Sequence, residues 1–586
     1  MSLQVPSNIK LRNALASPPP AGATFASFVL FGSLAALAAM VYAGGEWWSM
    51  ASFGFSSDAG WVRAVFARNV SAGHFLTFNP GSPVAGAAAP AWILPFGIVG
   101  YLLGYVLAAK ALGAVCVVLA AFLVWQITLD LLGDWRFAFL AGLLVVTSPL
   151  LMSQAVSGTE GALAAMLVAA FMYWQAAGWE GGSRQRVAAA VAAALVALAR
   201  PELILLLPLL LVDRWLVAAR LAAPGRRFRS ALIYSFPEVV GAGLLLLPYV
   251  LFNWRAGGSL WQQPVIALRG QPALAWTIAA VSDLWANNPF LLCAAVLGVP
   301  VAALAAARTA SRHPSFLLIL TPAATLLAPG LIWRYLDRQN ATFAAAYLIP
   351  TIAILSSAGL FFLKRAANDL VLRSKTRATR AASGIGIACV LAGLSVLTWL
   401  AHESAWQQHS FLVKKENDLQ GYIGRWVAEH TAPDASIASR EIGAIGFFSR
   451  RRVIDLGGDI DRQALQYLRT AGSPDSSLLA FIQKTQPSYL AIRPSDFPDL
   501  SQRVDLLTPT VTCTEKDPFS GGVTTWVLYE TPWPAPSARA ARGQAAPKAR
   551  SEEGPSPSHR HGRAAARSDH AQSRPAGHGR IRRRRH

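Results

Sequence analysis

Long apolar runs dominate the first 400 positions of the chain and predict membrane-spanning helices. Most of these runs hold about 18–22 residues, enough for a helix to cross a hydrocarbon core of roughly 30 Å. A soluble core would instead produce shorter, amphipathic runs. The twelve candidate runs lie at 24–43, 88–109, 111–130, 135–153, 160–178, 186–199, 201–219, 231–252, 289–307, 315–333, 341–363 and 382–401.

Residues 402–534 follow a different pattern, which is typical of a small α/β domain. Gly421–His430 has the apolar period of an amphipathic helix, and Ser476–Lys484 predicts a second helix. Short β-type runs predict strands at Ser436–Ala438, Val453–Asp455 and Ser488–Ile492. From 535 to 586 the chain is rich in Pro, Ala, Arg, Ser, Gly and His and has no apolar period, so we expect a disordered basic tail.

Composition supports a membrane protein. The chain is 54% hydrophobic and only 14% charged, whereas about 25% of the residues in average globular chains are charged. The net charge of +21 does not indicate a nucleic-acid partner, because 13 Lys and Arg residues lie in the tail and most of the others in short loops between apolar runs. The four cysteines show neither a disulfide pattern nor metal-ligand spacing.

Loop charge favours eleven spans and a cytoplasmic N-terminus. If the run at 88–109 spans, the basic loops 213–230 and 364–380 face outward, against the positive-inside rule. If that run instead lies along the outer interface, both loops become cytoplasmic. The prolines and glycines of Pro83–Gly104 also suit a broken, re-entrant or in-plane element. The expected regions are a cytoplasmic N-terminus at 1–23, a transmembrane domain at 24–401 with a first outer loop at 44–110, an extracytoplasmic α/β domain at 402–534 and a tail at 535–586.

Polar residues at the outer ends of the predicted spans are the candidates for chemistry. Asp58 follows the first span, Glu160 opens the fourth, and Arg200 and Glu202 lie between the fifth and sixth. Ionisable groups at such positions often line a functional cavity. The alternative for Glu160 and Glu202 is a structural one, since acidic residues at helix N-termini stabilise the helix dipole. The sequence leaves both interpretations open.

Several motifs, in order, resemble one enzyme family. They read SSDAGWVRAVFARNVSAGHFLTFNPGSPVAGAAAPAW, AVSGTEGAL, ALARPELILL, PYVLFNWRAGGSLWQQP and REIGAIGFFSRRRVIDLGG. Together they are similar to the GT-C glycosyltransferases, and most of all to bacterial members related to the terminal arabinofuranosyltransferases of mycobacterial cell walls. The likeness is collinear from about residue 24 to residue 500 and implies a GT-C-like fold in a bacterial inner membrane.

The resemblance implies transfer of a sugar from a polyprenyl-phosphate donor to an envelope glycan or lipid acceptor. Asp58 would act as the catalytic base, and Glu160 would orient the substrate or a cation. Arg200 would pair with the donor phosphate, as would Arg338, which lies near a Gly-Arg-Tyr motif of the family. The resemblance further implies substrate contacts for Arg68, Asn69, His74 and Glu202, although a lone loop histidine such as His74 is more often structural.

This sequence also departs from the family pattern. Ser57 replaces the first of two paired acids, and Ala85 replaces a glutamate later in the loop. Losing two carboxylates argues against a metal-assisted mechanism and leaves a divalent cation only as an open alternative. Two rival functions follow: a non-catalytic envelope-assembly protein with a degenerate fold, or a transporter, which would predict inverted repeats and charges near the bilayer midplane.

Overall fold

The structure is a computed structural model, and it covers most of the chain. The parts that it describes are 20, 22–86, 89–180, 183–221, 227–260, 273–287, 289–308, 338–373, 377–469, 474–535 and 537. The predicted span at 315–333 and almost all of the predicted tail at 535–586 lie outside these residues.

The protein is mostly helical, as expected for a membrane protein whose apolar segments must hydrogen-bond their own backbone groups. Four helices are long and apolar enough to cross a bilayer, or up to six if each of two bent pairs forms one span, counted over the described residues only. Most of the predicted runs coincide with helices. These are α1 (Ala23–Met50), α4 (Tyr105–Leu132), α5 (Trp135–Val146), α6 (Pro149–Val156), α7 (Gly161–Glu180), α8 (Ser183–Ala199), α9 (Leu206–Leu221), α10 (Arg227–Gly257), α12 (Pro289–Arg308), α14 (Arg338–Arg373) and α15 (Arg377–Glu416).

The run at 88–109 is not one continuous helix. Its prolines and glycines predicted a broken, re-entrant or in-plane element, and the structure shows a break at Gly104. The run contains α3 (Pro90–Leu103), which ends at Gly104, where the backbone takes a φ of 81°. A 14-residue helix is about 21 Å long, too short to cross the hydrocarbon core. Two more helices lie outside the predicted apolar runs, namely α2 (Asp58–Ser71), in the predicted first outer loop, and α11 (Ala273–Asn287).

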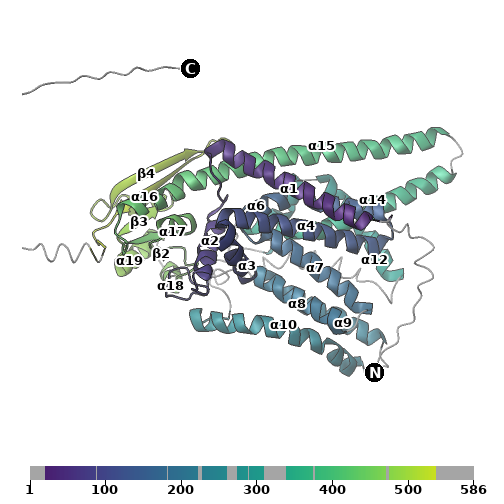
Figure 1. Cartoon of the computed structure of the whole chain (residues 1–586), viewed down its shortest axis with the longest axis horizontal. Helices are drawn as coiled ribbons and strands as arrows, with labels where there is room; N and C mark the ends of the chain where they lie inside the picture. Colours follow the sequence, from purple (N-terminus) through teal and green to yellow (C-terminus); the bar gives the residue numbers. More distant parts are fainter. Residues whose placement is uncertain are drawn as a thin grey trace, which may run out of the picture. The chain divides into compact units, whose positions relative to one another are not determined.

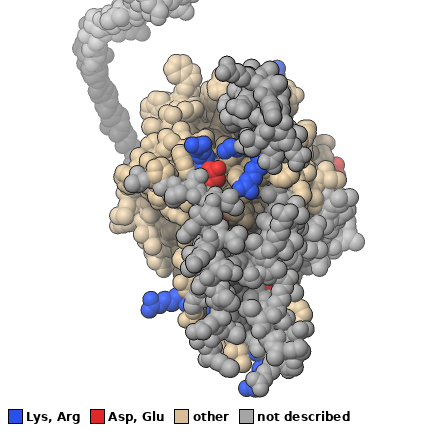
Figure 2. All heavy atoms as spheres, turned by 90° about the vertical axis from the view of Figure 1, so that its right-hand side faces the viewer, with Lys and Arg blue, Asp and Glu red and all other residues tan. Residues whose placement is uncertain are grey.

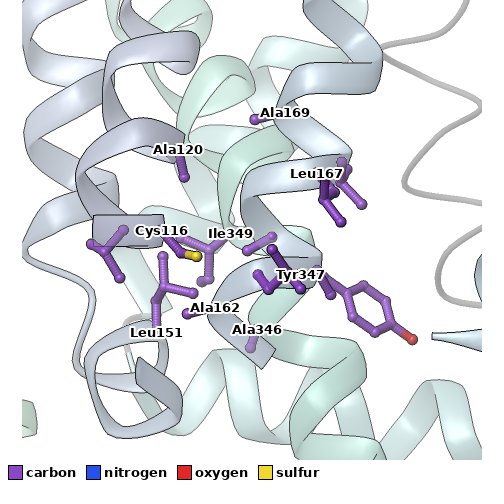
Figure 3. Packing of buried hydrophobic residues seen from close by; sticks show 14 of the residues in the cluster. Cys116, Ala120, Leu151, Ala162, Leu167, Ala169, Ala346, Tyr347 and Ile349 are labelled. Carbon is purple, nitrogen blue, oxygen red and sulfur yellow. The ribbon is translucent and has the colours of Figure 1, made fainter. Parts of the chain in front are cut away.

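Small residues allow the apolar helices to pack closely, as membrane helices commonly do. Figure 3 shows this packing around Ala120, Ala162 and Ala346, with the hydroxyl of Tyr347 pointing away from the cluster. Gly298 on α12 and Gly359 on α14 are pressed against the facing backbone. A Cβ at Gly298 would lie 1.9 Å from the carbonyl oxygen of Leu355, so no larger residue fits there without moving a helix.

A five-stranded mixed sheet follows the last long helix, which confirms the predicted α/β character of this region. The three predicted strands correspond to β1 (Ser436–Ser439), β2 (Arg452–Asp455) and β3 (Tyr489–Ile492), which are mutually parallel. An antiparallel hairpin of β4 (Thr508–Lys516) and β5 (Val523–Glu530), which the sequence reading missed, completes the order β2-β1-β3-β5-β4.

Both faces of the sheet are covered, because neighbouring strand residues point to opposite sides. Ala438 and Leu490 pack with α19 (Pro474–Thr485), whereas Ile437 and Ala491 pack with α16 (Tyr422–His430). Two further helices, α17 (Gly443–Ser449) and α18 (Arg462–Arg469), connect the strands. Figure 1 shows the strands and these helices gathered at one end of the long helices.

The link between the helical part and the sheet is continuous. The 40-residue helix α15 passes through one π-helical turn, η5 (Asn417–Gly421), directly into α16. Asn79 of the first outer loop adds a second connection: its side-chain amide donates to the carbonyl of Val453 at 2.8 Å and accepts from the amide of Val453 at 2.9 Å. A loop side chain thus pairs with the backbone of β2, the outermost strand on that side of the sheet.

Candidate active site

Glu160 lies at the centre of a buried ionic network. It occupies the turn between α6 and α7, and its carboxylate accepts two hydrogen bonds from Arg63 of α2, at 2.9 Å from Nε and 3.1 Å from Nη2. Arg200 donates a third bond, from Nη1 at 2.9 Å. The Glu160 side chain is fully buried, and the Arg63 side chain is 12% exposed. Such fork-like pairing is the strong form of the arginine–carboxylate interaction.

Arg200 and Glu202 are placed by a local break between helices. Pro201 cannot continue α8, so Arg200 is extended and a 3₁₀ turn, η2 (Pro201–Leu205), follows. The two side chains meet, with Arg200 Nε 2.8 Å from Glu202 Oε1. The hydroxyl of Tyr347 on α14 approaches the same oxygen at 3.5 Å, while Glu202 Oε2 has no hydrogen-bond partner among the described residues.

The charges of this network balance. Burial alone would raise the pKa of Glu160, but Arg63 and Arg200 outweigh it and lower that pKa to about 2. The pKa of Arg200 is raised, because Glu202 and Glu160 outweigh the effect of its burial. Glu160 is therefore ionised at neutral pH and holds the two arginines in place, which makes it a poor proton acceptor.

Asp58 has a different environment. It is the first residue of α2, after the extended Ser57, and its Oδ1 accepts hydrogen bonds from the backbone amides of Gly443 at 2.7 Å and Ala444 at 3.3 Å. Burial and the charge of Glu441 raise the pKa of Asp58 to about 8, although the two amides act in the opposite direction. A carboxylate with a pKa near the working pH is suited to accept a proton during a reaction.

The structure thus brings together three of the four residues expected to share a polar pocket. Glu160, Arg200 and Glu202 are in direct contact. The hydrogen bonds of Asp58 lead instead to α17, and α2 connects the two groups because it carries both Asp58 and Arg63.

The remaining predicted residues have the following positions. Arg68 donates to the carbonyl of Phe447 at 2.6 Å, and Asn69 donates to the carbonyls of Thr77 and Phe78, so both brace the first outer loop. His74 is exposed in that loop, and Arg338 begins α14, with its side chain outside the described structure. Their substrate roles stay predictions.

Two sets of buried charged residues were not predicted from the sequence. Arg63 is the first arginine after Asp58, but nothing local indicates its contact with Glu160, 97 positions away. A second buried group joins α1, α4 and α15: Glu46 Oε1 lies 2.6 Å from Lys110 Nζ and 2.7 Å from His409 Nε2. Lys110 within an apolar stretch is the signal that could have pointed to it, since ionisable residues in such stretches are usually paired.

The residues present do not fit a divalent cation. Among the described residues, no three His, Cys, Asp or Glu side chains are arranged to hold a metal ion. Oδ1 of Asp58 is occupied by two backbone amides, and neither Ser57 nor Ala85 can supply a carboxylate.

Comparison with known proteins supports a GT-C-like fold. Residues 407–539 match a family model described as a domain of unknown function, DUF8728, and no curated protein sequence matches the chain. ArnT from Cupriavidus metallidurans, solved with bound undecaprenyl phosphate, shares 15% identity and a TM-score of 0.56, covering 86% of this chain and 97% of that one.

Two archaeal structures have a similar arrangement. The apo oligosaccharyltransferase from Archaeoglobus fulgidus shares 13% identity and a TM-score of 0.55 over 84% of this chain and 74% of its own. The oligosaccharyltransferase AglB from the same organism was solved with an inhibitory peptide and a dolichol-phosphate. It shares 13% identity and a TM-score of 0.56 over 85% of this chain and 74% of its own. The chain therefore has the GT-C-like fold that its motifs predict.

Proposed function

We propose that this protein is a membrane glycosyltransferase that transfers a sugar from a polyprenyl-phosphate donor to a cell-envelope glycan or lipid. The observation that carries the proposal is the network of Arg63, Glu160 and Arg200, with Asp58 on the same helix as Arg63, in a GT-C-like fold. ArnT of that fold holds undecaprenyl phosphate, and an archaeal oligosaccharyltransferase holds a dolichol-phosphate. Both ligands are polyprenyl phosphates.

The reaction that suits these residues is a single displacement. Asp58, when ionised, accepts the proton of the acceptor hydroxyl as its oxygen attacks the anomeric carbon. The bond from that carbon to the phosphate oxygen breaks, and its electron pair leaves with the polyprenyl phosphate. Attack opposite to the leaving group inverts the anomeric centre.

Arginine is suited to stabilise the charge that develops on the phosphate. Arg200 is only 2% exposed and already pairs with two glutamates, whereas Arg63 is 12% exposed. Arg63 is therefore the more accessible phosphate partner, with Arg200 and Arg338 as further ones. Glu160 orients the two central arginines. Arg68, Asn69, His74 and Glu202 are assigned to substrate binding.

We further propose eleven spans in a bacterial inner membrane, with the sheet domain and the site on the extracytoplasmic side. Basic side chains gather around an acidic one on the face shown in Figure 2. Asp134, before α5, pairs with Lys364, near the end of α14, at 3.8 Å. Under the positive-inside rule, an end rich in Lys and Arg is the cytoplasmic one.

Cysteine labelling should reveal this orientation. In a variant without the native cysteines, a membrane-impermeant maleimide added to intact cells should modify Ser520→Cys, which lies exposed beyond β4, but not Ser183→Cys, at the start of α8. Both should react after the membrane is opened, which controls for accessibility. The reverse pattern would put the sheet domain in the cytoplasm and contradict the proposed orientation.

Carrier binding provides the direct test of function. Undecaprenyl phosphate should raise the Tm of the purified protein, because a ligand at about 100 times its Kd stabilises by about 2.7 kcal/mol. Arg63→Ala should weaken binding by about tenfold or more, since hydrogen bonds to charged groups contribute about 1.5–3 kcal/mol. Arg63→Lys should recover part of it by keeping the charge.

The matched control is Arg503→Ala, which removes an exposed guanidinium paired with Asp505 in the sheet domain and should leave binding unchanged. The companion measurement is release of undecaprenyl phosphate from a panel of undecaprenyl-phosphate sugars. If the carrier binds but no donor is consumed, the non-catalytic envelope-assembly alternative replaces the transferase. If Arg63→Ala and Arg503→Ala bind equally well, Arg63 is not the phosphate partner.

A further inference from the structure

The sheet domain is in direct contact with Asp58. Both hydrogen bonds that Asp58 Oδ1 accepts come from Gly443 and Ala444, at the start of α17. The approach is so close that a Cβ at Gly443 would lie 2.2 Å from the carbonyl oxygen of Asp58 and 2.8 Å from its Oδ1. Only glycine permits this approach, so a segment 385 positions away fixes the orientation of the carboxylate.

The same segment carries Glu441, which is held on two sides. Its Oε1 lies 2.9 Å from Arg493 Nη2, which follows β3, and its Oε2 accepts a hydrogen bond from Gln420 of the π-helical turn. Gln420 is only 3% exposed. A π-turn is an uncommon element that occurs often at functional sites. Here it brings Gln420 to Glu441, which lies two residues before the Gly443 amide that binds Asp58.

A third carboxylate, that of Glu416, interacts electrostatically with Glu441 and Asp58. Glu416, the last residue of α15, has a buried oxygen, Oε2, without a hydrogen-bond partner among the described residues. The charged groups that act on Asp58 are therefore Glu441 before α17, Glu416 at the end of α15 and Asp459 after β2. Arg493 supplies positive charge to Glu441, with which it pairs, and together with Lys415 it opposes the rise in the pKa of Glu416.

We propose that the sheet domain completes the catalytic centre: Gly443 and Ala444 orient Asp58, and Glu441 is a positioning residue that controls when Asp58 can accept the proton of the acceptor. This inference rests on the proposed function. It gives the region that matches a domain of unknown function a defined task in the chemistry of the membrane domain.

Electrostatics explain how Glu441 acts. Burial, then the negative charge of Glu441, raises the pKa of Asp58. Burial, Glu441 and Asp58 raise the pKa of Glu416 well above its usual range. The charges of closely spaced carboxylates disfavour one another, so Asp58 and Glu416 each ionise less easily than an isolated carboxyl group. Removing the charge of Glu441 makes ionisation of Asp58 easier, and removing the charge of Arg493 makes it harder.

The test is the pH dependence of kcat/KM for transfer. Glu441→Gln should move the acidic limb to lower pH by about one unit, which raises transfer about tenfold at pH values well below the original midpoint. Arg493→Gln should move it to higher pH. Glu441→Asp keeps the charge and should stay near the wild type. Glu429→Gln, an exposed glutamate at the end of α16, is the matched control and should not move the limb.

A second readout needs no turnover. Because the folded-state pKa of Asp58 is raised, its contribution to stability is present below its unfolded-state pKa and is lost as the pH rises through about 8. Glu441→Gln should reduce this decline in Tm between pH 6 and about 9.

The outcomes separate the two proposals. If Asp58→Asn abolishes transfer while Glu441→Gln leaves both the limb and the Tm profile unchanged, Glu441 has no such role and the inference is wrong. If Asp58→Asn remains fully active, the base in the proposed function is misassigned, whatever Glu441 does.

Discussion

Asp58→Asn should lower transfer by roughly 10²-fold or more, the scale commonly found when a general base is lost. The amide oxygen of asparagine can still accept from Gly443 and Ala444, so the start of α2 and its contact with α17 should be kept. The side chain can no longer accept the proton of the acceptor hydroxyl. The loss should therefore appear in kcat, measured with saturating donor and acceptor.

Asp517→Asn is the matched control for this variant. Asp517 Oδ1 also accepts from two backbone amides, those of Phe519 at 2.8 Å and Ser520 at 3.3 Å, but in the exposed turn between β4 and β5. Asp517→Asn should therefore leave transfer unchanged. If Asp58→Asn retains full activity, Asp58 is not the catalytic base. If neither Asp58→Asn nor Glu160→Gln lowers transfer in an assay in which the wild type is active, neither residue is catalytic and the motifs do not mark an active site.

Stability should distinguish a catalytic Asp58 from a merely structural one. Asparagine resembles the neutral form that burial favours, so Asp58→Asn should not lower the Tm at pH 8. A large fall in Tm at that pH would mean that the ionised carboxylate holds α2 against α17, and the lost activity would then follow from unfolding.

The helices could be predicted from the sequence because a bilayer requires each spanning segment to be an apolar helix of about 20 residues, and such runs are visible in the sequence. The bend between α5 and α6, 48° in the structure, was not predicted, although Pro149 and the Ser148 cap mark it locally. The β4–β5 hairpin was missed for a different reason. β4 lies at the sheet edge and is mostly exposed, so its sequence TPTVTCTEK lacks the apolar signal of a buried strand.

The candidate site could be predicted in part. Motifs located Glu160, Arg200 and Glu202 because each lies at a helix end, where a local break in the pattern is visible. The partners of these residues are set by packing between distant segments. No spacing rule connects Arg63 with Glu160 or Asp58 with Gly443, so the structure was needed to separate a buried ionic network from a carboxylate with a raised pKa.

Glu160→Gln should lower the free energy of unfolding by about 3–5 kcal/mol, because it leaves two largely buried guanidinium groups without their shared partner. It should also lower transfer, since Arg63 and Arg200 lose the group that orients them. The measurement is thermal unfolding in detergent or nanodiscs alongside the transfer assay. Asp505→Asn removes a carboxylate from an exposed pair with Arg503 and should leave the Tm unchanged.

The pH dependence gives this prediction its sign. The pKa of Glu160 is lowered from 4.5 to about 2. Its stabilisation is therefore present above pH 4.5 and is lost as the pH falls towards 2, a loss that Glu160→Gln should lack. Adding Arg63→Gln to Glu160→Gln should restore part of the Tm, because one unpaired charge is removed with its partner. If Glu160→Gln is as stable as the wild type and the double variant is less stable, the arginines do not depend on Glu160. The network would then not be the organising element of the site.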